Sequence, residues 1–143
     1  MLQCSRWIVG LITVLLLQSA NAVADRPSAP EQIAGTTRLG AEQVVELILH
    51  SPNLVIIDAR KPEAFKRGHI EGAVNILDTV LDSNILARYA SAKDTPLLIY
   101  CNGEACLRST NAATHAVQWG YTQVYWFRGG WQEWTAKELP VSR

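Results

Sequence analysis

Three short apolar runs, separated by segments with helical patterning, constrain the fold more than any other feature of the sequence. The runs are Leu54 to Ile57, Pro96 to Tyr100 and Val124 to Phe127. Continuous apolar runs of this length are typical of strands that are buried on both faces of a sheet. Between them, apolar residues recur at helical spacing, as in residues 107–119, which stop before Gly120. This alternation predicts an α/β domain with a mostly parallel sheet.

The same patterns place the other elements along the chain. Helices are expected at residues 41–50, 62–67, 79–90, 107–119 and 131–137, and a fourth, short strand at residues 73–76. In a parallel α/β sheet, chemistry is concentrated beyond the carboxyl ends of the strands. The candidate functional residues are therefore Cys101, directly after one strand, and Asp58 and Arg60, at the end of another.

The N-terminal segment has the composition of a signal peptide. Arg6 and the amino terminus are followed by the apolar run Trp7 to Leu17, which is shorter than the roughly 20 residues that a membrane span needs. Small residues then match a cleavage site after Ala22 or Ala24. We therefore expect residues 1–24 to direct export to the periplasm or the medium, with no stable membrane association after cleavage.

The rest of the chain has room for one domain. Residues 25–36 are polar and contain Pro27, Pro30 and Gly35, which favours a linker or a loosely attached arm. Residues 37–143 then form the folded domain. The formal net charge is +0 and no run of Lys and Arg is present, so nucleic acid is not an expected partner.

Two cysteines, Cys101 and Cys106, lie beyond the predicted cleavage site. In an oxidising compartment a structural disulfide is the default interpretation. A disulfide that closes so small a loop removes little entropy from the unfolded chain, so chemistry is a better reason for the pair. Two cysteines without a nearby pair of histidines fall short of the four ligands of a zinc site, and no metal is expected.

The segment from Cys101 to the next predicted helix has the features of an anion cradle. Its backbone amides can curl around the Cys101 sulfur, Gly103 eases the curl, and Arg108 adds a positive charge. Such surroundings stabilise a thiolate or a persulfide anion. The predicted cradle consists of Asn102, Gly103, Glu104, Ala105, Cys106, Leu107 and Arg108.

Several segments together resemble the rhodanese domain family. They are Val55-Ile56-Ile57-Asp58-Ala59-Arg60, Gly68-His69-Ile70, Gly72-Ala73-Val74-Asn75-Ile76, Leu98-Ile99-Tyr100-Cys101, Arg108-Ser109, Gly129-Gly130 and Leu139-Pro140-Val141. The resemblance implies a parallel sheet of about five strands with helices on both faces. It also implies sulfurtransferase activity without a cofactor, in which Cys101 takes sulfane sulfur from a small donor, carries it as a persulfide, and passes it to a thiol, cyanide or a protein.

By the same resemblance, Asp58, Arg60 and Ser109 support the loop. Members of the family place an arginine five positions after the cysteine, whereas Arg108 is seven positions after Cys101, so this loop is two residues longer. Glu104 beside the nucleophile would repel a dianion, which predicts weak activity with thiosulfate.

Three other functions fit parts of the pattern. Cys101 and Cys106 could cycle as a thiol–disulfide oxidoreductase, with Cys106 as the resolving thiol, although inert packing of Cys106 is an equal alternative. A cysteine phosphatase also uses a cysteine, a nest of amides and an arginine, at a spacing of six. A non-catalytic module that binds sulfur or a partner is the last alternative.

Overall fold

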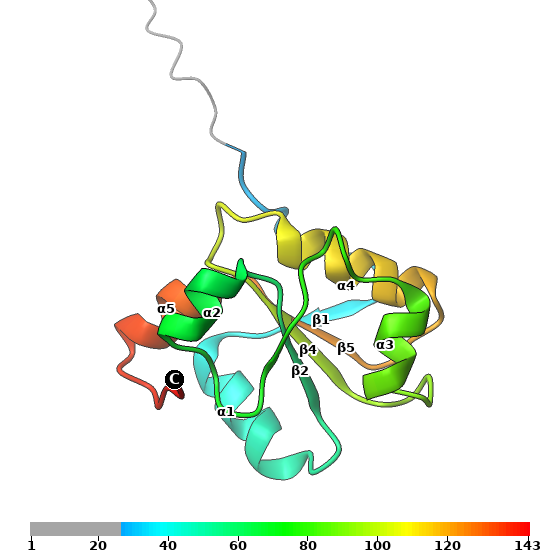
Figure 1. The fold of residues 1–143 in the computed structure, drawn as a ribbon, viewed down its shortest axis with the longest axis horizontal. Helices are drawn as coiled ribbons and strands as arrows, with labels where there is room; N and C mark the ends of the chain where they lie inside the picture. The colour runs from blue at the N-terminus through cyan, green and yellow to red at the C-terminus, as the bar shows by residue number, and fades with distance from the viewer. Residues whose placement is uncertain (1–26) are drawn as a thin grey trace, which may run out of the picture.

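The computed structural model describes residues 27–143, which form a five-stranded parallel sheet with helices on both faces (Figure 1). The strands are β1 (Thr36–Arg38), β2 (Val55–Asp58), β3 (Val74–Asn75), β4 (Leu97–Tyr100) and β5 (Val124–Phe127), in the spatial order β1-β5-β4-β2-β3. The helices are α1 (Ala41–His50), α2 (Pro62–Arg67), α3 (Ser83–Tyr89), α4 (Arg108–Gln118) and α5 (Gly130–Ala136). The predicted fold class is confirmed. The predicted signal peptide lies outside the described residues.

Both faces of the sheet are buried, as the continuous apolar runs require. Alternate residues of β4 point to opposite sides, so Leu97 and Ile99 pack with α3 and α4, whereas Leu98 and Tyr100 pack with α1 and α5. Helix α4 approaches the sheet closely because its inner face consists of the small residues Ala112, Ala113 and Ala116. No helix within residues 27–143 is long and apolar enough to cross a membrane.

Residues 25–36 were predicted to be a linker or a loosely attached arm, but the described part of this segment packs against the domain. Ala29 and Ile33 are buried in the same cluster as α4, and the chain then enters the sheet as β1, at Thr36. This strand is held by parallel pairing to β5 and has no apolar run of its own, so the hydrophobic pattern gave no sign of it.

Helix α3 begins later than the sequence pattern indicated, because an aspartate caps it. The Asp82 side chain accepts hydrogen bonds from the amides of Asn84 and Ile85, at 2.8 and 2.7 Å. An N-cap of this kind fixes the first turn. The preceding residues 77–81 are left as a turn that reaches toward the carboxyl edge of the sheet, where Asp78 bonds Asn111 of α4.

Candidate active site

The carboxyl ends of the three central strands lie in register. Asp58 of β2 pairs with Tyr100 of β4, which pairs with Phe127 of β5. The residues that follow β4 and β5 therefore emerge at the same edge, and these are Cys101 and Arg128. Cys101 is buried, with 1% of its surface exposed, and it opens the loop that leads to α4.

Cys101 and Cys106 form a disulfide within this loop, with their Cα atoms 6.3 Å apart. The sequence had left the state of the pair open. The predicted cradle of amides is not formed around the bonded sulfur: in the described part of the chain no loop amide donates to the Cys101 sulfur, and the Cys106 amide bonds the Gly103 carbonyl at 2.9 Å. A disulfide sulfur is neutral and a weak acceptor, so it does not organise amides as an anion does.

The start of the loop is fixed by the N-terminus of α5. The amides of Trp131 and Gln132 donate to the carbonyls of Cys101 and Asn102, both at 2.8 Å. Gly130 makes this approach possible, since it has a left-handed φ of 53° and a Cβ there would lie 2.3 Å from the Cys101 carbonyl oxygen. The hydrogen bonds from α5 therefore fix the backbone of the loop at Cys101 and Asn102.

Arg108 is placed at the other end of the loop, as the first residue of α4. Its Nη1 lies 3.7 Å from the sulfur of Cys106, so the positive charge of the guanidinium lies next to the disulfide. Ser109 is buried and accepts a hydrogen bond from the indole of Trp126 at 3.1 Å. Ser109 thus anchors α4 to the sheet, and it is Arg108 that faces the sulfur.

Glu104, in the loop that follows Cys101, forms an ion pair with a distant arginine. Its carboxylate pairs with Arg128 Nη1 at 2.5 Å, and Arg128 also donates to the carbonyls of Pro30 and Ala29 at 2.8 and 3.0 Å. The Ala29 amide in turn donates to the Glu104 carbonyl at 2.6 Å. Arg128 also lies 2.9 Å from a carboxylate oxygen of Glu31, so one guanidinium faces two carboxylates. The repulsion of anionic donors by Glu104 stays a prediction.

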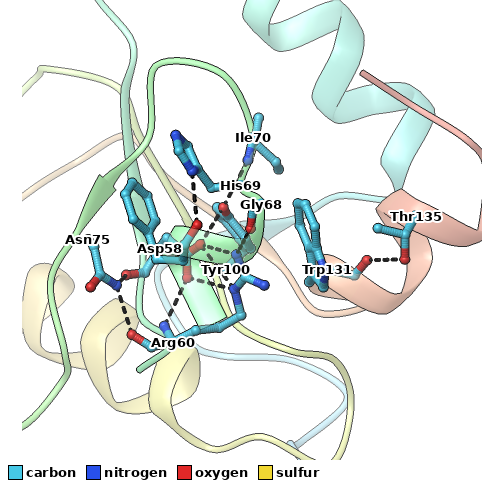
Figure 2. Close-up of polar contacts among 10 residues, drawn as sticks. Asp58, Arg60, Gly68, His69, Ile70, Asn75, Tyr100, Trp131 and Thr135 are labelled. Atoms are coloured by element: carbon cyan, nitrogen blue, oxygen red, sulfur yellow. Dashed lines mark hydrogen bonds and ion pairs between the residues drawn. The ribbon is translucent and has the colours of Figure 1, made fainter. Parts of the chain in front are cut away.

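Asp58 and Arg60 form a buried ion pair on the other side of the loop (Figure 2). Arg60 Nε lies 3.0 Å from both carboxylate oxygens, and Nη2 reaches one of them at 2.6 Å and the Gly68 carbonyl at 2.7 Å. The Tyr100 hydroxyl donates to the same carboxylate at 2.6 Å. Burial, followed by the charge of Asp58, raises the pKa of the Tyr100 phenol far above its usual value.

This ion pair is coupled to the loop through an aromatic side chain. The guanidinium of Arg60 lies 4.3 Å from the centre of the Trp131 ring, and the Trp131 amide is the donor to the Cys101 carbonyl. Tyr100, which directly precedes Cys101, is held by the same carboxylate. Asp58 and Arg60 therefore position the end of β4 and the start of α5, which both contact Cys101.

A pocket of about 600 Å³ lies over the loop. It is lined by Pro27, Asp78, Thr79, Asn102, Gly103, Ala105, Cys106, Leu107, Arg108, Asn111 and Gln132. Six of the seven predicted cradle residues are among them, and Glu104 is the exception. Cys106 lines the pocket, whereas the buried Cys101 is not among its lining residues.

Sequence reasoning missed the part of this site that comes from distant segments. Arg128 was overlooked although it follows a buried strand just as Cys101 does, and that position was the available signal. Asp78, Asn111 and Gln132 carried no signal in the sequence, because only the fold brings them to the pocket. Within residues 27–143, no group of three or more His, Cys, Asp or Glu side chains is placed to hold a metal ion.

Comparison with known proteins places the geometry in context. Residues 41–137 match the family described as the rhodanese-like domain. The thiosulfate sulfurtransferase GlpE of Pseudomonas entomophila is 34% identical over 100 residues, which cover 68% of this chain and 83% of that protein. The uncharacterized protein YibN of Escherichia coli K12 is 28% identical over 96% of this chain and 87% of its own length. The polysulfide-sulfur transferase of Wolinella succinogenes superimposes with a TM-score of 0.62 at 21% identity, over 76% of this chain and 80% of that one.

Proposed function

The chain belongs to the rhodanese-like domain family, and from that premise we propose that it is a sulfurtransferase whose Cys101 carries sulfane sulfur as a persulfide. The observation that carries the proposal is the position of Cys101. It lies at the carboxyl end of the central strand β4 and opens the loop that leads to the N-terminus of α4, where Arg108 is the first helical residue. The N-terminus of α4 and the positive charge of Arg108 favour a sulfur anion in this loop.

The reaction begins once the disulfide is reduced. The Cys101 thiolate attacks the outer sulfur of a sulfane donor, the remainder of the donor departs with its electron pair, and Cys101–S–S⁻ remains. With thiosulfate the departing group is sulfite. A nucleophilic acceptor then takes the outer sulfur and restores the thiolate. Arg108, at the rim of the pocket, offsets the negative charge of donor and persulfide.

The donor and acceptor enter through the pocket above the loop. Small sulfane donors fit its volume of about 600 Å³, and its lining offers both charge from Arg108 and an apolar contact from Leu107, which is 41% exposed. We propose a thiol, cyanide or a protein thiol as acceptor. We also propose export, on the composition of residues 1–24. N-terminal sequencing of the protein from the periplasm or medium tests this, and a mature chain that begins at Met1 would contradict it.

The test of the proposed reaction uses thiocyanate formation from a sulfane donor and cyanide. Cys106→Ser is the reference, because it cannot form the disulfide, and the double variant Cys101→Ser with Cys106→Ser is its matched control. We expect the reference to form thiocyanate and the double variant to fall to the uncatalysed background. Equal rates in the two proteins would rule out Cys101 as the sulfur carrier.

The observed disulfide favours one second candidate, a thiol–disulfide oxidoreductase. That activity needs both cysteines and no sulfur donor. Reduction of a model protein disulfide by the reduced chain, lost in either Cys→Ser variant, would support it. A rate no faster than that of free dithiothreitol alone would exclude it.

A further inference from the structure

The pocket exposes a second sulfur that the proposed transfer reaction does not use. Cys106 lines the cavity and is 8% exposed, whereas Cys101 is 1% exposed and is not part of the lining. The 6.3 Å between their Cα atoms is within the roughly 4.4–6.8 Å range from which two cysteines bond without backbone movement. A sulfur placed on Cys101 would therefore have a thiol beside it in the same loop.

We propose that Cys106 resolves the Cys101 persulfide, so that the domain releases sulfane sulfur as hydrosulfide and finishes the cycle in the disulfide state seen here. The proposal rests on the proposed function, since it begins with the persulfide. It makes the chain a sulfane-sulfur reductase, in which a dithiol supplies the electrons, rather than only a carrier of sulfur.

The step balances within the loop. The Cys106 sulfur attacks the Cys101 sulfur, the bond from Cys101 to the outer sulfur breaks, and the outer sulfur leaves with the electron pair and the Cys106 proton: Cys101–S–S⁻ plus Cys106–SH gives Cys101–S–S–Cys106 plus HS⁻. The outer sulfur gains two electrons, and the two cysteine sulfurs lose one each. No further oxidant is needed.

Arg108 is placed to assist this step. Its Nη1 is 3.7 Å from the Cys106 sulfur, and a cation beside a thiol favours the thiolate, which is the attacking form. The same charge stabilises the departing hydrosulfide at the pocket. The amides of Trp131 and Gln132 hold the start of the loop, so the Cys101 backbone is fixed while the Cys106 sulfur attacks.

The return to the dithiol state requires a reducing dithiol, and the structure indicates which sulfur it attacks. Cys106 faces the pocket and Cys101 does not, so an incoming thiolate reaches the Cys106 sulfur and expels Cys101 as the leaving group. The two reducing equivalents come from the dithiol, which becomes a disulfide. The sulfur that accepts the next donor is thereby released as a thiolate.

The experiment is a single turnover with the full chain, reduced with dithiothreitol, desalted under argon, and given thiosulfate or glutathione persulfide without any acceptor. Hydrosulfide is measured with a fluorescent bimane, and the protein is measured by intact mass. The wild type is expected to release one hydrosulfide per chain and to lose the mass of two hydrogens. Cys106→Ser is expected to gain one sulfur atom and to release no hydrosulfide until dithiothreitol is added.

Each outcome decides the matter. Wild type that keeps the added sulfur, or Cys106→Ser that releases hydrosulfide as fast as wild type, overturns the resolving role while it leaves the persulfide intact. Cys106→Ser that gains sulfur from neither donor overturns the proposed function, and the resolving role falls with it. The two failures are thus distinguishable in one experiment.

Discussion

Replacing Arg60 with methionine tests how the buried ion pair supports the loop. The Asp58 carboxylate is fully buried, and Arg60 supplies three of its contacts, at 2.6 to 3.0 Å. Methionine keeps an unbranched apolar stem but offers no donor and no charge, so the contact of the guanidinium with the Trp131 ring is lost together with the ion pair.

The expected loss of unfolding free energy depends on which hydrogen-bond donors Asp58 keeps in Arg60→Met. Removing one partner of a buried pair typically costs about 3–5 kcal/mol, because an uncompensated charge stays behind. Here two donors would remain, the Tyr100 hydroxyl and the Arg60 backbone amide, which places the loss near the lower end, at about 3 kcal/mol. Asp58→Asn combined with Arg60→Met removes the stranded charge, so the double variant should lose less than the two single losses summed.

Equilibrium unfolding in urea measures these losses, with the m-value as a check that only stability has changed. Lys137→Met is the matched control, because Lys137 pairs with Glu42 on the surface. We expect no resolvable shift of its midpoint. The reasoning is refuted if Arg60→Met shifts the midpoint no more than this control does, or if the losses at Asp58 and Arg60 add.

Three further outcomes are expected. Gly130→Ala should lower the free energy of unfolding by about 1–2 kcal/mol because of the left-handed φ alone, and by more because its Cβ would contact the Cys101 carbonyl. Unfolding in urea measures this loss, and a loss no larger than that of Lys137→Met would contradict the prediction. Burial raises the pKa of Tyr100, so the contribution of its protonated phenol to the free energy of unfolding should be full below about pH 10 and fall above it. Tyr100→Phe should therefore reduce the loss of stability with rising pH. An unchanged slope in the variant would count against burial as the cause. Arg128→Met should free residues 27–35 to proteases with little loss of global stability, and limited proteolysis that leaves them protected would contradict this.

The elements that could be predicted from sequence are those whose signal is local. Continuous apolar runs mark β2, β4 and β5, and helical spacing of small residues marks the inner face of α4. Cys101 could be located because it directly follows one of these strands. β1 carries the polar residues Thr-Thr-Arg and exists only through its pairing with β5, so no local pattern marks it.

The sequence predicted the loop residues of the candidate site but not the residues that distant segments bring to it. Arg128 bonds Pro30 across 98 residues of sequence, and such a contact leaves no periodic trace. The ion pair of Glu104 with Arg128 could not be predicted for the same reason, because only the fold brings the two residues together. The sequence also left the disulfide open, because its formation depends on how the loop curls between β4 and α4.

The most direct test of the central claim is to locate the transferred sulfur. Reduced Cys106→Ser would be incubated with thiosulfate isotopically labelled in its outer sulfur, alkylated, digested and analysed by mass spectrometry. The account predicts the label on the peptide that contains Cys101, as an alkylated persulfide. Label that is absent from this peptide, or that persists at the same level when Cys101 is also replaced by serine, would contradict it.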